Sequence, residues 1–179
     1  MRKPFLFASI LVFVEIAAAQ IPTSGNVFFG YSYLNTNLNG DRNSLNGWEG
    51  SVEAKVLPHI GLVADFSGHY GSETFRACNG FDCVIFDADV TQNNYLFGPR
   101  VSASFGKIRP FAELLIGASH VHIHALDTDT SFATGVGGGL DYRFLKILAW
   151  RMQGDYIHTS PFHTPQNNVR LSTGIVVRF

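Results

Sequence analysis

The sequence predicts an all-β protein in which eight antiparallel strands form an up-and-down barrel, and three observations lead to this prediction. Apolar and polar residues alternate in short segments that turn residues separate. The connections between these segments are short and long in turn. Charged residues make up only 15% of the chain, against about 25% in soluble domains, while aromatic residues reach 13%. This composition suits a sheet with one apolar face in lipid, so we expect a transmembrane β-barrel.

The chain opens with the pattern of a signal peptide, expected to cover residues 1–19, with the barrel domain at 20–179. Two basic residues come first, an apolar run of ten residues covers Phe5–Val14, and Ala17–Ala19 forms a small-residue cleavage site. Ten apolar residues are too few for a helix that crosses about 30 Å of hydrocarbon, so a membrane anchor is not expected. We therefore predict export followed by cleavage.

Strict alternation identifies the strands. In the segment 47–56, Trp48 and Val52 alternate with Glu49 and Glu53, so one face is apolar and the other is charged. The same pattern recurs along the chain. The eight predicted strands are 26–35, 47–56, 61–70, 94–104, 110–122, 132–144, 149–157 and 169–179.

The connections alternate in length. Those expected at 57–60, 105–109 and 145–148 are short, whereas those such as 71–93 and 158–168 are longer and polar. Outer-membrane barrels have this asymmetry, with short periplasmic turns and longer outer loops.

Two further patterns favour a membrane barrel over a soluble lipocalin-like carrier, which would turn its apolar face inward. The polar face carries balanced charges that can pair inside a narrow barrel, which offsets the cost of removing them from water. Aromatic residues of the apolar face cluster near the strand ends, as in interfacial girdles. The charges are Glu49, Glu53, Asp65, Glu113, Asp141 and Asp155 against Lys55, Arg100, Arg143, Arg151, Arg170 and Arg178. The aromatic residues are Tyr33, Trp48, Tyr70, Tyr95 and Tyr156 toward the long loops, and Tyr142, Phe144, Trp150 and Phe179 toward the short turns.

The chain resembles the OmpA-like family of small outer-membrane β-barrel domains. Phe29–Leu34 resembles the first strand of the family, Gly137–Tyr142 its glycine-rich sixth strand, and Val169–Phe179 its C-terminal assembly signal. The resemblance implies a location in the outer membrane of a Gram-negative bacterium, in contact with outer-membrane lipid and lipopolysaccharide. It also implies recognition by the barrel assembly machinery. The residues that would be read there are Leu171, Thr173, Ile175, Val177 and Phe179. The sequence departs from longer relatives because it has no peptidoglycan-binding domain after the barrel, so a role in cell-wall tethering is not expected.

Side chains usually fill the interior of an eight-stranded barrel. We therefore expect an ion-pair network that closes the lumen, with the glycine column of 132–144 leaving room for large arginine side chains. Pairing that is only local or through water is the alternative. The predicted members are Glu53, Asp65, Arg100, Glu113, Asp141 and Arg151.

Cys78 and Cys83 fall in the second long loop. An exported chain meets an oxidising compartment, so a disulfide between them is predicted. Two thiolates alone are too few ligands for a metal site.

His120, His122 and His124 alternate on one outward face at the end of a strand. They could form a transition-metal patch, but a polar rim near lipid headgroups is the favoured interpretation. No metal and no cofactor are predicted.

His158 and Ser160 prompt comparison with outer-membrane lipid A deacylases. A nucleophilic serine needs a histidine base and an acid that orients it. The nearest acid is Asp155, which is expected to face the lumen, so catalysis is not predicted.

The sequence thus predicts a non-enzymatic outer-membrane barrel, structural or narrow pore-forming. The main alternative is an adhesion or interaction protein that acts through its outer loops, and a lipid A-modifying hydrolase is a remote one. A formal net charge of −1 for the chain gives no reason to expect a nucleic-acid partner.

Overall fold

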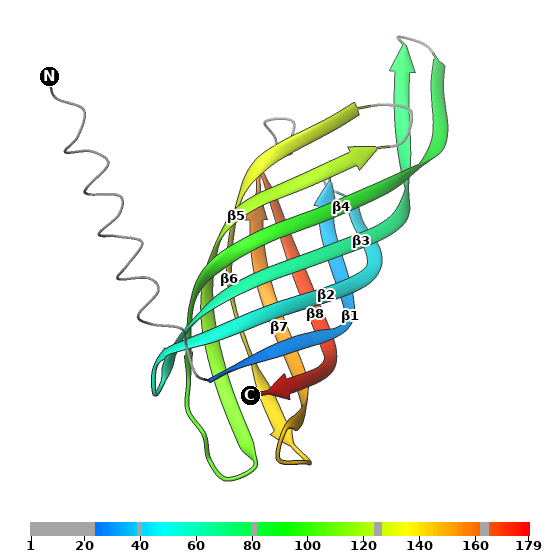
Figure 1. Ribbon diagram of the computed structural model, residues 1–179. Helices are drawn as coiled ribbons and strands as arrows, with labels where there is room; N and C mark the ends of the chain where they lie inside the picture. The colour runs from blue at the N-terminus through cyan, green and yellow to red at the C-terminus, as the bar shows by residue number, and fades with distance from the viewer. Residues whose placement is uncertain (1–23, 39–40, 80–81, 124–126, 162–164) are drawn as a thin grey trace, which may run out of the picture.

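The computed structural model is a closed barrel of eight antiparallel strands, which confirms the predicted fold class (Figure 1). It describes residues 24–38, 41–79, 82–123, 127–161 and 165–179, and the side chains among them except those in 37–42, 73–87 and 127. Each strand pairs with its neighbours in sequence, and β1 pairs with β8 to close the sheet. The strands are β1 (Gly25–Leu38), β2 (Asp41–Leu57), β3 (Ile60–Asn79), β4 (Asp82–Ser102), β5 (Ile108–Ile123), β6 (Asp127–Arg143), β7 (Leu148–Thr159) and β8 (Gln166–Arg178).

The main difference from the prediction lies between β3 and β4. The segment 71–93 was expected to be a long loop, and this expectation is wrong. The two strands continue as a hairpin whose pairing runs from Gly71 opposite Val90 to Asn79 opposite Asp82. Alternation is weak over most of this segment, although Ala88 and Val90 at the base of the extension are buried with Leu34 and Leu45. The segment is nevertheless rich in β-branched and aromatic residues, which favour strands.

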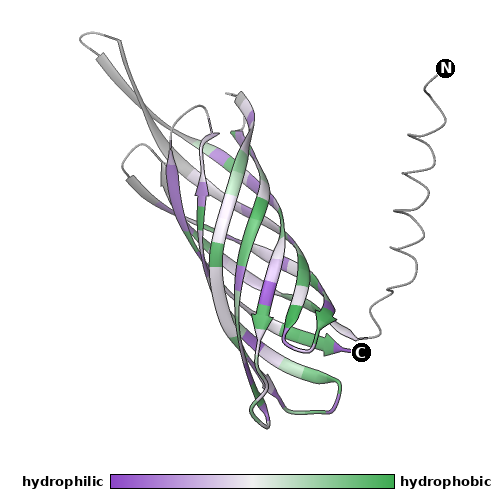
Figure 2. Cartoon of the chain, turned by 90° about the vertical axis from the view of Figure 1, so that its left-hand side faces the viewer, coloured by the Kyte–Doolittle hydropathy of each residue, from purple (hydrophilic) through white to green (hydrophobic). Residues whose placement is uncertain are grey.

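The two faces of the sheet have opposite character. Arg100, Arg151 and Arg170 point inward and are 0% exposed, whereas Phe29 and Leu114 point outward and are 65% and 60% exposed. Figure 2 shows hydrophobic and hydrophilic residues alternating along the strands. A soluble carrier would have the opposite arrangement, with apolar side chains inside.

Aromatic side chains line both ends of the outer face. At the end with the long connections, hereafter the loop end, Trp48 and Tyr156 are 39% and 46% exposed. At the end with the short turns and the C-terminus, hereafter the turn end, Tyr142 and Trp150 are both 44% exposed. The indole of Trp150 donates to the Thr173 hydroxyl at 2.8 Å, which fixes the ring against the barrel wall.

The short turns are tight. Phe105 and Ile108 pair across Gly106 and Lys107 at the tip of the connection between β4 and β5, and Gly106 has a φ of 63°, which suits glycine in such a tight turn. At the barrel seam, the Gly25 amide donates to the Phe179 carbonyl at 3.0 Å, and the Phe179 amide donates to the Gly25 carbonyl at 3.2 Å. The last residue is therefore tied to the start of β1.

No helix in the described part of the chain is long and apolar enough to cross a membrane. The predicted signal peptide, residues 1–19, lies outside the described residues.

Candidate functional site

The interior of the barrel holds two groups of charged side chains. The turn-side cluster consists of Glu53, Arg100, Arg109, Glu113, Asp141 and Arg151. Arg100 lies 2.6 Å from Glu113 and 3.3 Å from Glu53, and Arg151 lies 2.7 Å from Asp141. Three guanidinium groups therefore face three carboxylates. This one-to-one balance offsets the desolvation cost that buried ions carry.

Aromatic rings complete the turn-side cluster. The Arg100 guanidinium lies 4.4 Å from the centre of the Phe111 ring, and the Arg151 guanidinium lies 4.6 Å from the same ring. Arg151 also lies 5.1 Å from the Phe28 ring. Rings at these distances attract cations and fill space that water would otherwise occupy.

The loop-side cluster is built around a single cation. Arg170 lies 2.7 Å from Asp65, 2.8 Å from Asp155 and 3.3 Å from Glu49. Ser172 donates a hydrogen bond to Glu49, which gives that carboxylate a second partner. Three carboxylates thus share one guanidinium, so Arg170 holds this cluster together.

One amide joins the two clusters. The Gln153 side-chain nitrogen lies 3.0 Å from carboxylate oxygens of Glu49, Glu113 and Asp155. An amide has two N–H donors, so three acceptors share them. Because β7 carries Gln153 while β2 carries Glu49, the contact crosses the lumen rather than following neighbouring strands.

Apolar side chains and uncharged polar side chains such as Ser32, Gln92 and Asn94 occupy the rest of the described interior. Toward the loop end, Leu34, Leu45 and Val121 are buried together, and near the turn end Phe28 packs with Val176. A third apolar group on the inward faces of β3 to β7 comprises Val63, Leu96, Leu115, Ala133 and Ile157. The lumen is therefore packed with ionic, uncharged polar and apolar side chains.

The glycine column of β6 leaves space in the lumen, as expected. Asp155 and Phe111 lie in that space beside Gly137 and Gly139, in place of the arginine side chains that the sequence predicted. A Cβ at Gly137 would lie 1.8 Å from the Asp155 Oδ1 atom, and one at Gly139 would lie 2.7 Å from the Phe111 ring. The space beside these glycines holds a carboxylate and an aromatic ring.

The structure brings all six predicted network residues into the interior. Five of them are in the turn-side cluster, and Asp65 is in the loop-side cluster. The main residue that the sequence analysis missed is Arg109, which was assigned to a turn. It is 3% exposed and pairs with Glu53. Its spacing of four residues from Glu113 places both on the same strand face, and this parity was the available signal.

Two of the charges expected on the polar face lie at the turn end instead. Lys55 is partly exposed and its ammonium group lies 3.5 Å from the Pro58 carbonyl. Arg143 is exposed and donates to the Gly106 carbonyl at 2.9 Å. Arg178 is intermediate, with a 20% exposed side chain 3.3 Å from Asp141.

The predicted assembly-signal residues lie on the outward face of β8 and at its end. Four of them are between 44% and 64% exposed, namely Leu171, Ile175, Val177 and Phe179. Thr173 is only partly exposed, and its hydroxyl bonds to the Trp150 indole and to the Arg151 carbonyl. The recognition of this strand stays a prediction.

The predicted disulfide stays untested, because the side chains of Cys78 and Cys83 lie outside the described ones. The backbone register of the β3–β4 hairpin pairs these two positions directly. Directly opposed residues of an antiparallel pair have Cβ atoms about 4.5–5.5 Å apart, which a disulfide can bridge after a small adjustment.

The outward histidines bond to neighbouring polar groups. The Nδ1 atom of His120 lies 2.7 Å from the Thr130 hydroxyl, and that of His122 lies 2.6 Å from the Thr128 hydroxyl. His124 lies outside the described residues. Among the side chains that the structure describes, no three His, Cys, Asp or Glu residues are grouped so as to hold a metal ion.

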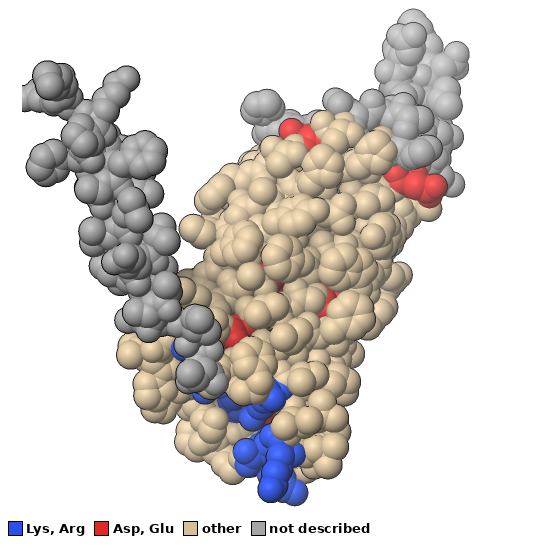
Figure 3. Space-filling model, viewed as in Figure 1, with Lys and Arg blue, Asp and Glu red and all other residues tan. Residues whose placement is uncertain are grey.

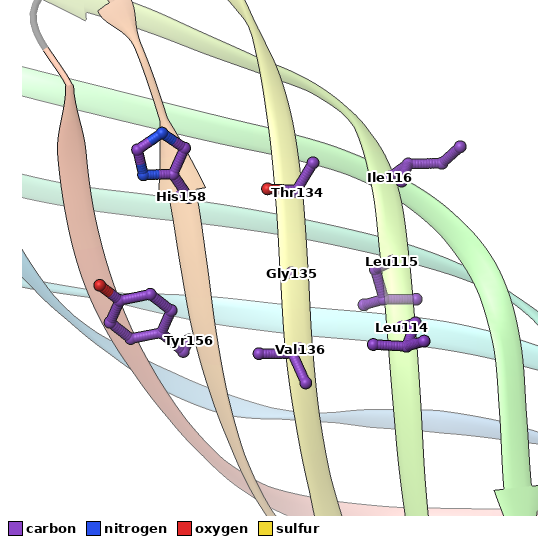
Figure 4. A pocket seen from close by; sticks show the side chains of 8 residues that line it. All are labelled: Leu114, Leu115, Ile116, Thr134, Gly135, Val136, Tyr156 and His158. Carbon is purple, nitrogen blue, oxygen red and sulfur yellow. The ribbon is translucent and has the colours of Figure 1, made fainter.

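The candidate hydrolase residues are not brought together. Asp155 points into the lumen toward Arg170, whereas His158 is exposed on the outside and its Nδ1 atom lies 2.8 Å from the Asn167 amide oxygen. The wall below His158 carries a shallow groove between β5, β6 and β7 (Figure 4). Its lining is mostly apolar and comprises Leu114, Leu115, Ile116, Thr134, Gly135, Val136, Tyr156 and His158. The groove is mostly apolar, and the hydrogen-bond partner of His158 is an amide rather than a carboxylate.

No family model matches the sequence, and neither does any curated protein. Among solved structures, the chain is similar to Neisserial surface protein A, with a TM-score of 0.70 and 12% identity, over 87% of this chain and 97% of that one. It is also similar to Ail, the attachment invasion locus protein of Yersinia pestis, with a TM-score of 0.61 and 13% identity, over 87% of this chain and 98% of that one. At such identities the likeness shows the fold, which is consistent with an OmpA-like barrel.

Proposed function

We propose that this protein is an integral outer-membrane barrel with a sealed lumen, which serves as a rigid anchor for the structures at its loop end. The observation that carries this proposal is the inversion of the two faces. Large apolar side chains such as Phe29, Leu114 and Ile116 are exposed around the wall, while arginines and carboxylates are buried inside. An apolar surface of this extent is unstable in water and stable in hydrocarbon.

The packed interior supports anchoring over pore formation. Arg170 of β8 reaches Asp65 of β3, and Arg109 of β5 reaches Glu53 of β2. Each of these pairs spans the lumen between strands that are not neighbours. An ion crossing the barrel would have to displace several such pairs, so we expect negligible conductance.

Gel mobility and fractionation test the membrane assignment. The folded protein should be in the outer-membrane fraction and migrate faster before boiling than after it. Recovery as a soluble protein without detergent would contradict the proposal. In planar bilayers the wild type should not conduct, and Arg100→Ala, which removes one buried guanidinium, should conduct more. Steady channels in the wild type would contradict the sealed lumen.

A second function, surface interaction, is favoured by the β3–β4 hairpin. In the described register, β3 pairs with β2 only up to Tyr70, and β4 pairs with β5 only from Val90. Beyond these residues the hairpin is a two-stranded ribbon that rises past the other strands (Figure 1). Both of its edges can accept an added strand, which is a common mode of protein recognition.

The charge of the loop end indicates the chemistry of such a partner. Seven acidic and two basic residues lie in the four segments of the sequence at the loop end, which include the outer ends of the strands and cover residues 36–46, 71–93, 123–131 and 158–168. The Ail structure holds the polysulfated heparin analogue sucrose octasulfate. For this chain we expect the reverse preference, because an acidic rim repels polyanions and attracts basic surfaces.

Deletion of residues 73–89 tests this second function. The shortened barrel should fold and keep its heat-dependent gel mobility, because the deleted ribbon pairs only with itself. Binding to a cationic surface, such as a polylysine-coated sensor, should fall. Equal binding by the deleted and intact proteins would contradict a role for the hairpin.

A further inference from the structure

The turns at the turn end of the barrel carry basic side chains. The three short connections together with the strand ends beside them, residues 54–61, 102–110 and 142–149, contain no acidic residue. Figure 3 shows the basic side chains gathered at this end of the molecule. At this end, the basic residues other than Arg100, Arg109 and Arg151 of the turn-side cluster are Lys55, Lys107, Arg143, Lys146 and Arg178. The acidic loop end and this basic turn end give the molecule a charge polarity along its axis.

A concavity of about 650 Å³ lies among these basic side chains. It is lined by Lys107, Arg143, Phe144, Leu145 and Lys146, so three cations and two apolar side chains form its walls. A volume of this size is within the range of about 300–1,000 Å³ that small-molecule sites occupy.

Two hydrogen bonds to backbone carbonyls hold the two turns that form this pocket against each other. The Arg143 amide donates to the Lys107 carbonyl at 2.8 Å, and the Arg143 guanidinium donates to the Gly106 carbonyl at 2.9 Å. The positive φ of Gly106 allows the tight turn that brings Lys107 to this position. These two bonds hold the β4–β5 and β6–β7 turns side by side, and this arrangement places Lys107 next to Arg143.

The apolar residues of these turns place the pocket at a membrane interface. Phe105, Phe144, Leu145 and Ile147 are 69%, 47%, 55% and 59% exposed, and the rings of Tyr142 and Trp150 follow on the adjoining strands. Exposed apolar side chains next to cations and an aromatic belt are typical of the zone of lipid headgroups. Lysine stems can follow the apolar surface there while their ammonium groups reach phosphates.

We propose that this pocket binds the headgroup of an anionic phospholipid in the periplasmic leaflet, of the phosphatidylglycerol type. The inference rests on the proposed membrane location. Lys107, Arg143 and Lys146 would hold the phosphate, and Phe144 and Leu145 would contact the upper acyl chains. A zwitterionic headgroup cancels much of this attraction, so the site discriminates by net charge.

Lipid retention measured by native mass spectrometry tests the proposal. The barrel is released from vesicles that contain equal parts of phosphatidylglycerol and phosphatidylcholine. We compare the wild type, the triple variant Lys107→Gln with Arg143→Gln and Lys146→Gln, and the control Lys55→Gln, which removes a charge at the same end outside the pocket. The wild type and the control should retain phosphatidylglycerol in preference. The triple variant should lose that preference by roughly tenfold or more.

Three outcomes would overturn the proposal. They are equal retention of the two lipids by the wild type, an unchanged preference in the triple variant, and equal loss in the Lys55 control. Glycerol phosphate is added as a soluble competitor, and its displacement of the lipid would show a phosphate site instead of a lipid site. The double variant Lys107→Gln with Lys146→Gln keeps Arg143 and its bond to Gly106, so the turns should keep their structure. This double variant should still lose most of the preference for phosphatidylglycerol.

Gel mobility of the protein in phosphatidylcholine vesicles distinguishes a wrong lipid site from a wrong membrane assignment. If the wild type inserts and shows no preference, only the lipid site is wrong. If the wild type does not insert at all, the membrane assignment is wrong as well.

Discussion

Two inward glycines of β6 provide a matched test of how tightly the lumen is packed. A Cβ at Gly137 would lie 1.8 Å from Asp155 Oδ1 and 2.8 Å from the Gly154 carbonyl, distances at which atoms overlap. Two residues earlier, a Cβ at Gly135 would be 3.5 Å from its nearest neighbour, Leu115 Cβ, which is ordinary contact. The same substitution, glycine to alanine, should therefore have opposite effects at these two positions.

The cost at Gly137 follows from what Asp155 holds. This carboxylate lies 2.8 Å from Arg170 and 3.0 Å from Gln153, so it cannot rotate away without weakening both contacts. Overpacking costs about 1–3 kcal/mol, and loosening a hydrogen bond between charged groups costs about 1.5–3 kcal/mol. We expect Gly137→Ala to lower the free energy of unfolding by about 2–5 kcal/mol.

Gly135→Ala should instead leave stability unchanged or raise it by up to about 1 kcal/mol, because alanine restricts the unfolded chain and meets no clash. Urea unfolding of the barrel in detergent micelles, followed by tryptophan fluorescence and gel mobility, measures both variants. With a slope of about 1–3 kcal/mol per molar urea, Gly137→Ala should shift the midpoint down by about 0.7–5 M. Equal midpoints for the two variants would refute the packed lumen.

Three further predictions concern the charges, the hairpin and the last residue. Arg170→Met leaves three buried carboxylates without their cation and should destabilise the barrel by about 3–5 kcal/mol. Adding Asp65→Asn should recover part of this loss, and strictly additive losses of the two substitutions in urea unfolding would contradict the clustered arrangement. Reduction of the exported protein should increase its intact mass by two hydrogens if Cys78 and Cys83 form a disulfide, and an unchanged mass would contradict it. Phe179→Ala should lower the amount of folded barrel in the outer membrane severalfold while leaving refolding in detergent intact, and an equal loss in both assays would point to a purely structural role for the ring.

The periodic pattern of the sequence was enough to predict the barrel and the direction of most side chains. Period two assigns each residue to a face without knowledge of its neighbours, and Glu53 and Arg100 were expected inside for this reason. The alternation did not predict the position of residues beside a turn or in a segment that pairs outside the barrel wall. Arg109 adjoins a turn, and most of the β3–β4 ribbon beyond Tyr70 pairs only with itself, so it needs no continuous apolar face.

Only the tertiary structure decided which charges meet. Arg170 and Asp65 are 105 residues apart and lie on strands that are not paired, so their contact depends on how the sheet closes and how far its strands are staggered. A linear pattern carries the face of each residue but not its height in the barrel. For the same reason the sequence could show that the turns are basic, but only the bonds from Arg143 to Gly106 and Lys107 showed that two turns form one pocket.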